Sequence, residues 1–140
     1  MKINIFYDQI KYRLRRSKKV KELIIKVIRN EKKIPGDLNF VFTNDNFVRE
    51  INRKFLNHDY YTDVITFDNS EGNNISGEIY ISVDTVRINA KKYRSTLRDE
   101  IIRVMIHGTL HLCGYDDKEE EEKRNMFERG EIYVNEIFEE

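Results

Sequence analysis

The sequence has few of the residues that cross-link, stiffen or anchor a chain. Its 140 residues include one cysteine, one proline, six glycines and no tryptophan. A single cysteine excludes an internal disulfide framework and is consistent with a reducing compartment. No apolar run approaches the length of about 20 residues that a membrane-spanning helix needs, and no segment resembles a signal peptide. We therefore expect a cytoplasmic protein that has no membrane partner.

A net charge is also missing, although 36% of the residues are charged. The 25 basic and 25 acidic residues cancel, so the protein as a whole sets up no field that attracts nucleic acid. The charges are nevertheless segregated, because residues 11–21 hold lysine and arginine without an acid, while residues 116–122 are mostly acidic. A basic stripe can bind phosphates, but a solvated helix start is the simpler explanation of the same residues.

The hydrophobic pattern predicts one α/β (α+β) domain that spans residues 1–140. Strands are expected at residues 2–6, 38–43, 64–67 and 77–82. Helices are expected near residues 12–29, 45–55, 83–93, 97–113 and 118–138, with a turn at residues 34–37 and a possible break at Gly130. The short connection between the last two strands favours an antiparallel hairpin. The expected fold is therefore a small mixed four-stranded sheet packed with about five helices.

The predicted helix 97–113 is apolar nearly all round, which indicates a buried central helix. It carries His107 and His111, whose spacing of four places both imidazoles on one face. Gly114 can end the helix, and the chain can then bring Asp117 back to the pair. Two imidazoles and one carboxylate leave a position open on a tetrahedral ion, as in a catalytic zinc site. One such histidine alone would more simply be a core residue bonded to a carbonyl.

Asp116 competes with Asp117 for the third position, but the spacing from Gly114 favours Asp117. Asp116 would then orient the site or shape the turn. Zinc proteases carry a glutamate general base directly after the first histidine, whereas this chain has Gly108 there, so peptide hydrolysis by that route is not expected. A zinc ion can still lower the pKa of its bound water to about 7 and polarise a phosphoryl oxygen.

Residues 107–117 resemble the H-G-x-L-H-L-x-G-Y-D-H signature of the rRNA maturation endoribonucleases, the YbeY family. The sequence matches every defined position but the last, and the blocks 50–52, 62–67 and 77–82 follow in the family's order. The resemblance implies a single-domain protein with one zinc ion that cleaves single-stranded RNA in rRNA 3′-end maturation and ribosome quality control. It implies rRNA and the ribosome as partners. Carried over by position, the metal ligands are His107, His111 and Asp117.

Two residues depart from that family pattern. Asp117 stands where the family usually has histidine, and its negative charge should make the metal a weaker Lewis acid and alter the metal preference. Leu56 stands where the family usually has an arginine thought to hold the RNA phosphate. Arg53 or His58 could replace that arginine, although both can equally be ordinary surface residues.

The leading hypothesis is a zinc-dependent endoribonuclease in which a metal-bound water near Asp116 attacks, or assists attack on, an RNA phosphodiester. The candidate catalytic residues are Asp116, Arg53 and His58, and the candidate RNA-binding residues are Arg15, Arg16, Lys18, Lys19, Tyr61 and Phe67, with Tyr60 as a further stacking platform. Loss of the usual arginine favours an alternative, a non-catalytic RNA- or ribosome-binding factor with a structural metal. An iron oxygenase has the same ligand set but is usually built on a β-barrel.

Overall fold

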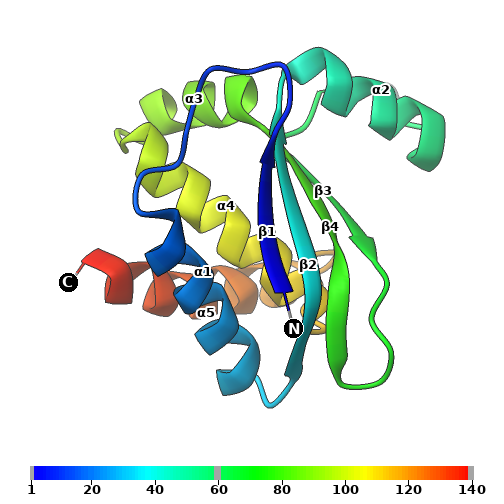
Figure 1. The fold of residues 1–140 in the computed structure, drawn as a ribbon, viewed down its shortest axis with the longest axis vertical. Helices are drawn as coiled ribbons and strands as arrows, with labels where there is room; N and C mark the ends of the chain where they lie inside the picture. Colours follow the sequence, from blue (N-terminus) through cyan, green and yellow to red (C-terminus); the bar gives the residue numbers. More distant parts are fainter. Residues whose placement is uncertain (1, 59–60, 139–140) are drawn as a thin grey trace.

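A four-stranded sheet in spatial order β1-β2-β4-β3 organises the computed structural model, which describes residues 2–58 and 61–138 (Figure 1). The strands are β1 (Lys2–Tyr7), β2 (Ile34–Thr43), β3 (Val64–Asp68) and β4 (Asn74–Ser82). The first two strands pair in parallel, and β2 also pairs in parallel with β4. The edge strand β3 forms an antiparallel hairpin with β4. The mixed sheet and the hairpin expected from the sequence are both confirmed.

The helices are α1 (Ser17–Asn30), α2 (Asp45–Leu56), α3 (Val83–Lys92), α4 (Leu97–Leu112) and α5 (Glu120–Phe138). Short polar side chains cap the start of α2, α3 and α4. Asn44, Ser82 and Thr96 each accept a hydrogen bond from the backbone N–H three residues ahead, at 2.9, 3.2 and 3.1 Å. Such caps satisfy N–H groups that have no partner inside the helix.

Alternation along the strands divides the core between the two faces of the sheet. On β4, Ile79 and Ile81 point to the face covered by α1 and α4, and both are fully buried. Tyr80 points to the other face, where it packs with Val48 and Ile51 of α2. Figure 1 accordingly shows α2 on the opposite side of the strands from α1, α4 and α5.

The central buried helix is α4, as the sequence predicts. It contacts α1, α3, α5 and the strands β3 and β4. Its apolar side chains are almost completely enclosed, namely Ile101, Ile102, Val104, Met105, Ile106, Leu110 and Leu112. Within the described part of the chain, no helix combines the length and the apolar character that crossing a membrane requires.

Three local predictions are wrong. Residues 34–37 belong to β2 instead of a turn, because Ile34 and Pro35 pair with β4 and the register is irregular between Pro35 and Leu38. Helix α1 begins at Ser17 instead of near residue 12, since Arg16 takes a left-handed conformation with φ of 57°. Helix α5 runs through Gly130 without a break.

Gly77 on β4 lies where a side chain would collide with the neighbouring strand. A Cβ there would lie 2.4 Å from the backbone oxygen of Phe67 and 3.3 Å from Cδ1 of Leu112. Gly77→Ala should therefore lower the free energy of unfolding by about 1–3 kcal/mol, the usual cost of overpacking. Urea denaturation measures the change. Glu78→Ala, at the adjacent position facing the other side of the sheet, is the control, and equal effects of the two substitutions would contradict the packing argument.

Candidate metal centre

The turn after α4 brings His111 and Asp117 together. Gly114 has a φ of 110°, a conformation that suits glycine, and it lets the chain reverse directly after the helix. The Nε2 atom of His111 then lies 3.5 Å from Oδ2 of Asp117. The Nδ1 atom of the same imidazole lies 3.1 Å from the backbone oxygen of Tyr115. Because a carbonyl only accepts hydrogen bonds, Nδ1 carries the proton in the neutral ring.

This tautomer leaves an unshared electron pair on Nε2 that faces a carboxylate. Two acceptors at 3.5 Å are favourable only with a proton or a metal cation near both. Zinc–nitrogen distances of about 2.0–2.1 Å and zinc–oxygen distances of about 2.0–2.2 Å, at a tetrahedral angle, separate two ligand atoms by about 3.4 Å. The observed separation therefore fits two ligands of one tetrahedral ion. The Tyr115 carbonyl accepts the hydrogen bond from Nδ1, the nitrogen that does not face Asp117. In metal sites, a hydrogen bond from this second ring nitrogen orients the histidine ligand.

His107 lies one turn earlier on α4 and is more deeply enclosed. Its ring centroid lies 5.9 Å from that of Phe127 on α5. Its Nε2 atom is buried and has no hydrogen-bond partner among the described residues. Burial lowers the pKa of His107 to about 4, with smaller contributions in the same direction from Arg103 and His111. The imidazole is therefore neutral near pH 7, which is the state that binds a metal.

Gly130 on α5 explains why the helix passes so close to His107. A Cβ at Gly130 would lie 2.6 Å from both Cδ2 and Nε2 of the imidazole, so any side chain would collide with the ring. The glycine that seemed to permit a helix break thus has a packing function. The sequence shows that a glycine lowers helix stability at position 130, but it does not show that the His107 ring lies opposite.

The structure assembles only part of the predicted ligand set. His111 and Asp117 face each other, but no group of three His, Cys, Asp or Glu side chains that could hold a metal is found within residues 2–58 and 61–138. His107 contributes a buried, uncharged and unpartnered nitrogen on the same helix face. The donor chemistry fits a divalent ion, while His107 as the third ligand stays a prediction.

Asp116 shapes the turn that carries Asp117. Its Oδ1 atom accepts a hydrogen bond of 2.7 Å from the backbone N–H of Asp117. This is the turn-forming role that the sequence left open for it. Cys113, also in this stretch, is buried, and burial raises the pKa of its thiol to about 12, so it is a core residue and not a metal-binding thiolate.

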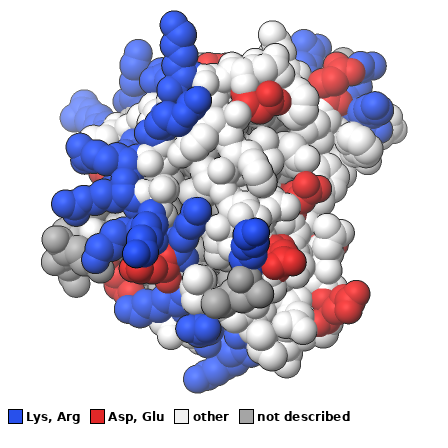
Figure 2. All heavy atoms as spheres, viewed as in Figure 1, with Lys and Arg blue, Asp and Glu red and all other residues white. Residues whose placement is uncertain are grey.

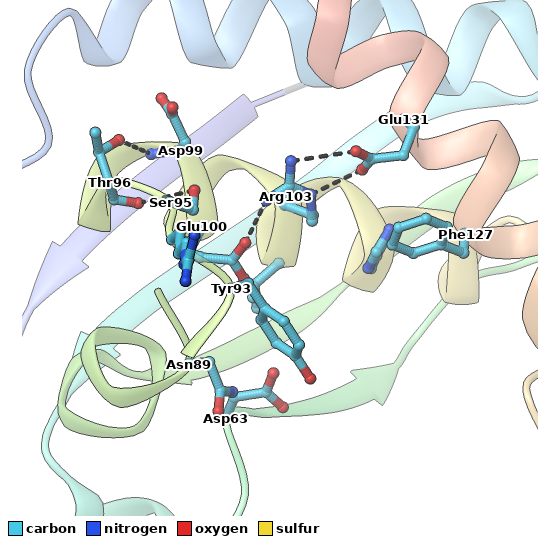
Figure 3. A pocket seen from close by; sticks show the side chains of 13 residues that line it. Asp63, Asn89, Tyr93, Ser95, Thr96, Asp99, Glu100, Arg103, Phe127 and Glu131 are labelled. Atoms are coloured by element: carbon cyan, nitrogen blue, oxygen red, sulfur yellow. Dashed lines mark hydrogen bonds and ion pairs between the residues drawn. The ribbon is translucent and has the colours of Figure 1, made fainter. Parts of the chain in front are cut away.

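A cavity of about 750 Å³ opens beside His107 (Figure 3). It is lined by polar and charged side chains that include Asp63, Asp99, Glu100, Arg103 and Glu131. Arg103 is held between Glu100 and Glu131, with hydrogen bonds of 2.8 and 3.2 Å to Glu131. Burial raises the pKa of Asp63.

Sequence reasoning missed both Asp63 and Arg103 as members of this cavity. Two signals were present. Asp63 belongs to the block 62–67 that follows the family pattern, and Arg103 lies four residues before His107 and therefore on the same helix face.

Arg53 and His58 lie on the other side of the sheet. Arg53 belongs to α2 and forms an ion pair with Glu50. His58 follows the end of α2, where its backbone N–H donates to the Asn52 carbonyl and its side chain is exposed. Neither residue lines the cavity beside His107. Their proposed replacement of the family arginine stays a prediction that this geometry does not favour.

The predicted RNA-binding residues fall on two separate surfaces. Arg15, Arg16 and Lys19 line a hollow of about 420 Å³ together with Arg98, whose guanidinium donates to the Arg15 carbonyl at 3.3 Å. Lys18 is exposed in the first turn of α1. Figure 2 shows Lys and Arg side chains gathered on the left of the molecule, where α1 and the segment leading into it lie.

The aromatic candidates lie on the α2 side. Phe67 packs edge-on against Phe55 and Tyr80, with ring centroids 6.0 and 5.9 Å apart. Tyr61 is 52% exposed, and the Arg49 guanidinium lies 5.0 Å from its ring centroid. Tyr60 lies outside the described residues. Phe67 is thus mainly a packing residue, whereas the face of Tyr61 is already covered by a cation.

Comparisons with known proteins agree with this architecture. Residues 3–137 match the family model described as Endoribonuclease YbeY. The chain is 43% identical over 132 residues to the Endoribonuclease YbeY of Karelsulcia muelleri, covering 94% of this chain and 93% of that protein. It is 44% identical over 125 residues to the protein of the same name from Cytophaga hutchinsonii, covering 89% and 87%.

A solved structure shows the same fold. The solution structure of TM1509 from Thermotoga maritima superposes with a TM-score of 0.70 at 31% identity, covering 98% of this chain and 89% of that one. Together these matches assign the protein to the hydrolases that act on RNA. The chain belongs to the endoribonuclease YbeY family.

His107 predicts a loss of stability in mild acid for the metal-free protein. An unfolded histidine takes up a proton near pH 6.5, whereas folded His107 stays neutral down to about pH 4. Between these values the unfolded state binds more protons, so the free energy of unfolding falls as the pH decreases from 6.5 to 4. The loss from this group is on the order of 3 kcal/mol.

Urea denaturation of the wild type and His107→Gln at pH 7 and at pH 4.5 isolates this contribution, because glutamine does not titrate. The variant should lose less stability between the two conditions than the wild type. The same loss in both proteins would show that His107 does not titrate differently on unfolding.

Proposed function

We propose that this protein is a zinc-dependent endoribonuclease that cleaves single-stranded RNA during rRNA 3′-end maturation and ribosome quality control. His107, His111 and Asp117 are the proposed ligands of a single zinc ion. The observation that carries the proposal is the 3.5 Å separation of His111 Nε2 from Asp117 Oδ2, because both atoms are acceptors and their spacing suits one tetrahedral ion. The names of the relatives supply the class of reaction.

The chain's own residues prepare this site. A zinc ion bound there would supply a Lewis acid for a phosphoryl oxygen and an activated water. His111 presents Nε2 because the Tyr115 carbonyl holds its Nδ1 proton. His107 stays uncharged because it is buried. Asp116 uses Oδ1 to accept the Asp117 N–H, and its carboxylate would serve as the general base that takes a proton from the water.

Three surfaces would contact the RNA: the basic residues at the start of α1, the cavity beside His107 and the exposed ring of Tyr61. Arg15, Arg16, Lys18 and Lys19 would attract the phosphates, with a salt dependence that grows with the number of contacts. The cavity beside His107 is large enough for part of a nucleotide, and acids outnumber arginines in its lining, so it suits a base or ribose better than a phosphate. Tyr61 is more exposed than Phe67, the other stacking candidate that the structure describes. The ribosome as partner and the cytoplasm as the place of action belong to the same proposal.

A second function is favoured by one observation. Leu56 is 41% exposed at the position where the resemblance implies an arginine, and Arg53 pairs with Glu50 across the sheet from α4. A protein without a cation for the scissile phosphate would bind RNA or the ribosome through its basic surface, with the metal in a structural role.

Elemental analysis combined with a cleavage assay tests the proposed function. Purified wild type should hold about one zinc per chain and cut single-stranded RNA faster than structured RNA. His111→Ala should bind zinc poorly and cleave more than about 100-fold more slowly, because metal catalysis contributes several kcal/mol and each 1.36 kcal/mol is tenfold in rate. Lys118→Ala, an exposed neighbour of the ligands, is the control.

The other outcomes are equally informative. Wild type that holds zinc and binds RNA but never cuts it would establish the binding factor instead. Wild type without any metal, or full cleavage by His111→Ala, would exclude the zinc mechanism.

A further inference from the structure

Glu31, directly after α1, is a partly buried carboxylate that the chemistry described so far does not use. Its side chain is 9% exposed. It accepts hydrogen bonds from the Tyr115 hydroxyl at 2.7 Å, the Tyr133 hydroxyl at 2.6 Å and the Arg129 guanidinium at 2.8 Å. Burial disfavours the charged form, but these hydrogen bonds outweigh it and lower the pKa of Glu31. The carboxylate is therefore ionised at neutral pH and holds three donors by charge-assisted bonds.

Tyr115 connects this carboxylate to the candidate metal centre. Its hydroxyl donates to Glu31, and its backbone oxygen accepts the Nδ1 proton of His111. Its backbone N–H donates to the Leu110 carbonyl at 3.1 Å, which closes the turn after α4. Asp116 and Asp117 follow directly in the chain. The position of one residue thus sets both the orientation of the imidazole and the start of the segment that carries the carboxylate ligand.

We propose that Glu31 is a positioning residue of the metal centre, which acts by holding Tyr115 so that its carbonyl orients His111 toward Asp117. The inference rests on the proposed function, since it concerns the same metal. Between α4 and α5, Cys113 is buried and Asp116 is half-buried, whereas Gly114, Asp117 and Lys118 are open to solvent. The Tyr115 hydroxyl anchors this segment to the N-terminal half of the chain, 84 residues away.

The structure offers a matched pair of substitutions. Tyr115→Phe and Tyr133→Phe each delete one hydroxyl that donates to Glu31, at 2.7 and 2.6 Å. Both should lower the stability of the fold, since both remove a hydrogen bond from a partly buried carboxylate. Only Tyr115 also holds His111, so only Tyr115→Phe should loosen the metal ligands. A purely structural role of Glu31 would make the two variants alike.

Zinc affinity, measured by competition with a chromophoric chelator, is the first readout. Tyr115→Phe and Glu31→Ala should each bind zinc about 10–100-fold more weakly than the wild type, the usual effect of losing a partner that orients a ligand. Tyr133→Phe should stay close to the wild type. Adding Tyr115→Phe to Glu31→Ala should cause no further loss, because both remove the same contact. Glu31→Gln, which keeps an acceptor oxygen, should recover part of the affinity.

The tautomer of His111 in metal-free protein is the second readout. Nitrogen-15 NMR of the imidazole should show the proton on Nδ1 in the wild type and in Tyr133→Phe. In Tyr115→Phe and Glu31→Ala the two tautomers should both be populated.

Equal zinc affinities of Tyr115→Phe and Tyr133→Phe would overturn the inference while leaving the proposed function intact. Wild type that binds no zinc would overturn the proposed function instead. In that case the His111 tautomer still tests whether Glu31 orients His111. An unchanged tautomer in Glu31→Ala would refute this orienting role.

Discussion

The close packing of α4 against the sheet determines where every candidate ligand lies. Gly108 allows this approach, since a Cβ there would lie 3.1 Å from Cγ2 of Ile79, and Gly77 on β4 makes room for Leu112 in the same way. Because interiors are densely packed, these contacts fix both the depth and the rotation of the helix. The rotation of α4 therefore directs His107 toward α5 and places His111 near the C-terminal end of α4, next to the turn. The geometry of the candidate metal centre is a consequence of how a buried helix ends.

Two clusters of ion pairs join α5, the most charged helix, to α4 and to the end of α1. Arg103 on α4 bonds Glu131, and Glu31 after α1 bonds Arg129. Both clusters combine a partly buried acid with an arginine, and such pairs resist screening by salt better than exposed ones. They fix α5 over His107, where Gly130 leaves room for the ring. A neutral chain with many charges thus uses some of them to join its own helices.

The sequence was sufficient for the features that depend on local pattern and failed where distant segments meet. Strand alternation and the buried character of α4 follow from periodicity, and the hairpin follows from the short connection between its strands. Pro35 and Gly36 favoured a turn by their chemistry, but parallel pairing with β4 overrides that preference. Arg53 was expected as a substitute for the arginine that is missing at Leu56, yet α2 packs on the other face of the sheet. The Glu31 cluster joins residues 84 to 102 positions apart, and no motif announces it.

Those long separations also order the events of folding. Contacts between residues so far apart require closing large loops before they return any free energy, so they form late. During synthesis the chain emerges from its N-terminus, so Glu31 meets Tyr115, Arg129 and Tyr133 only after these later residues have been made. The turn after α4 accordingly gains its hydrogen bond to Glu31 only after Tyr115 has been synthesised. An N-terminal fragment that ends before residue 115 therefore lacks both the Tyr115 contact with Glu31 and Asp117 itself.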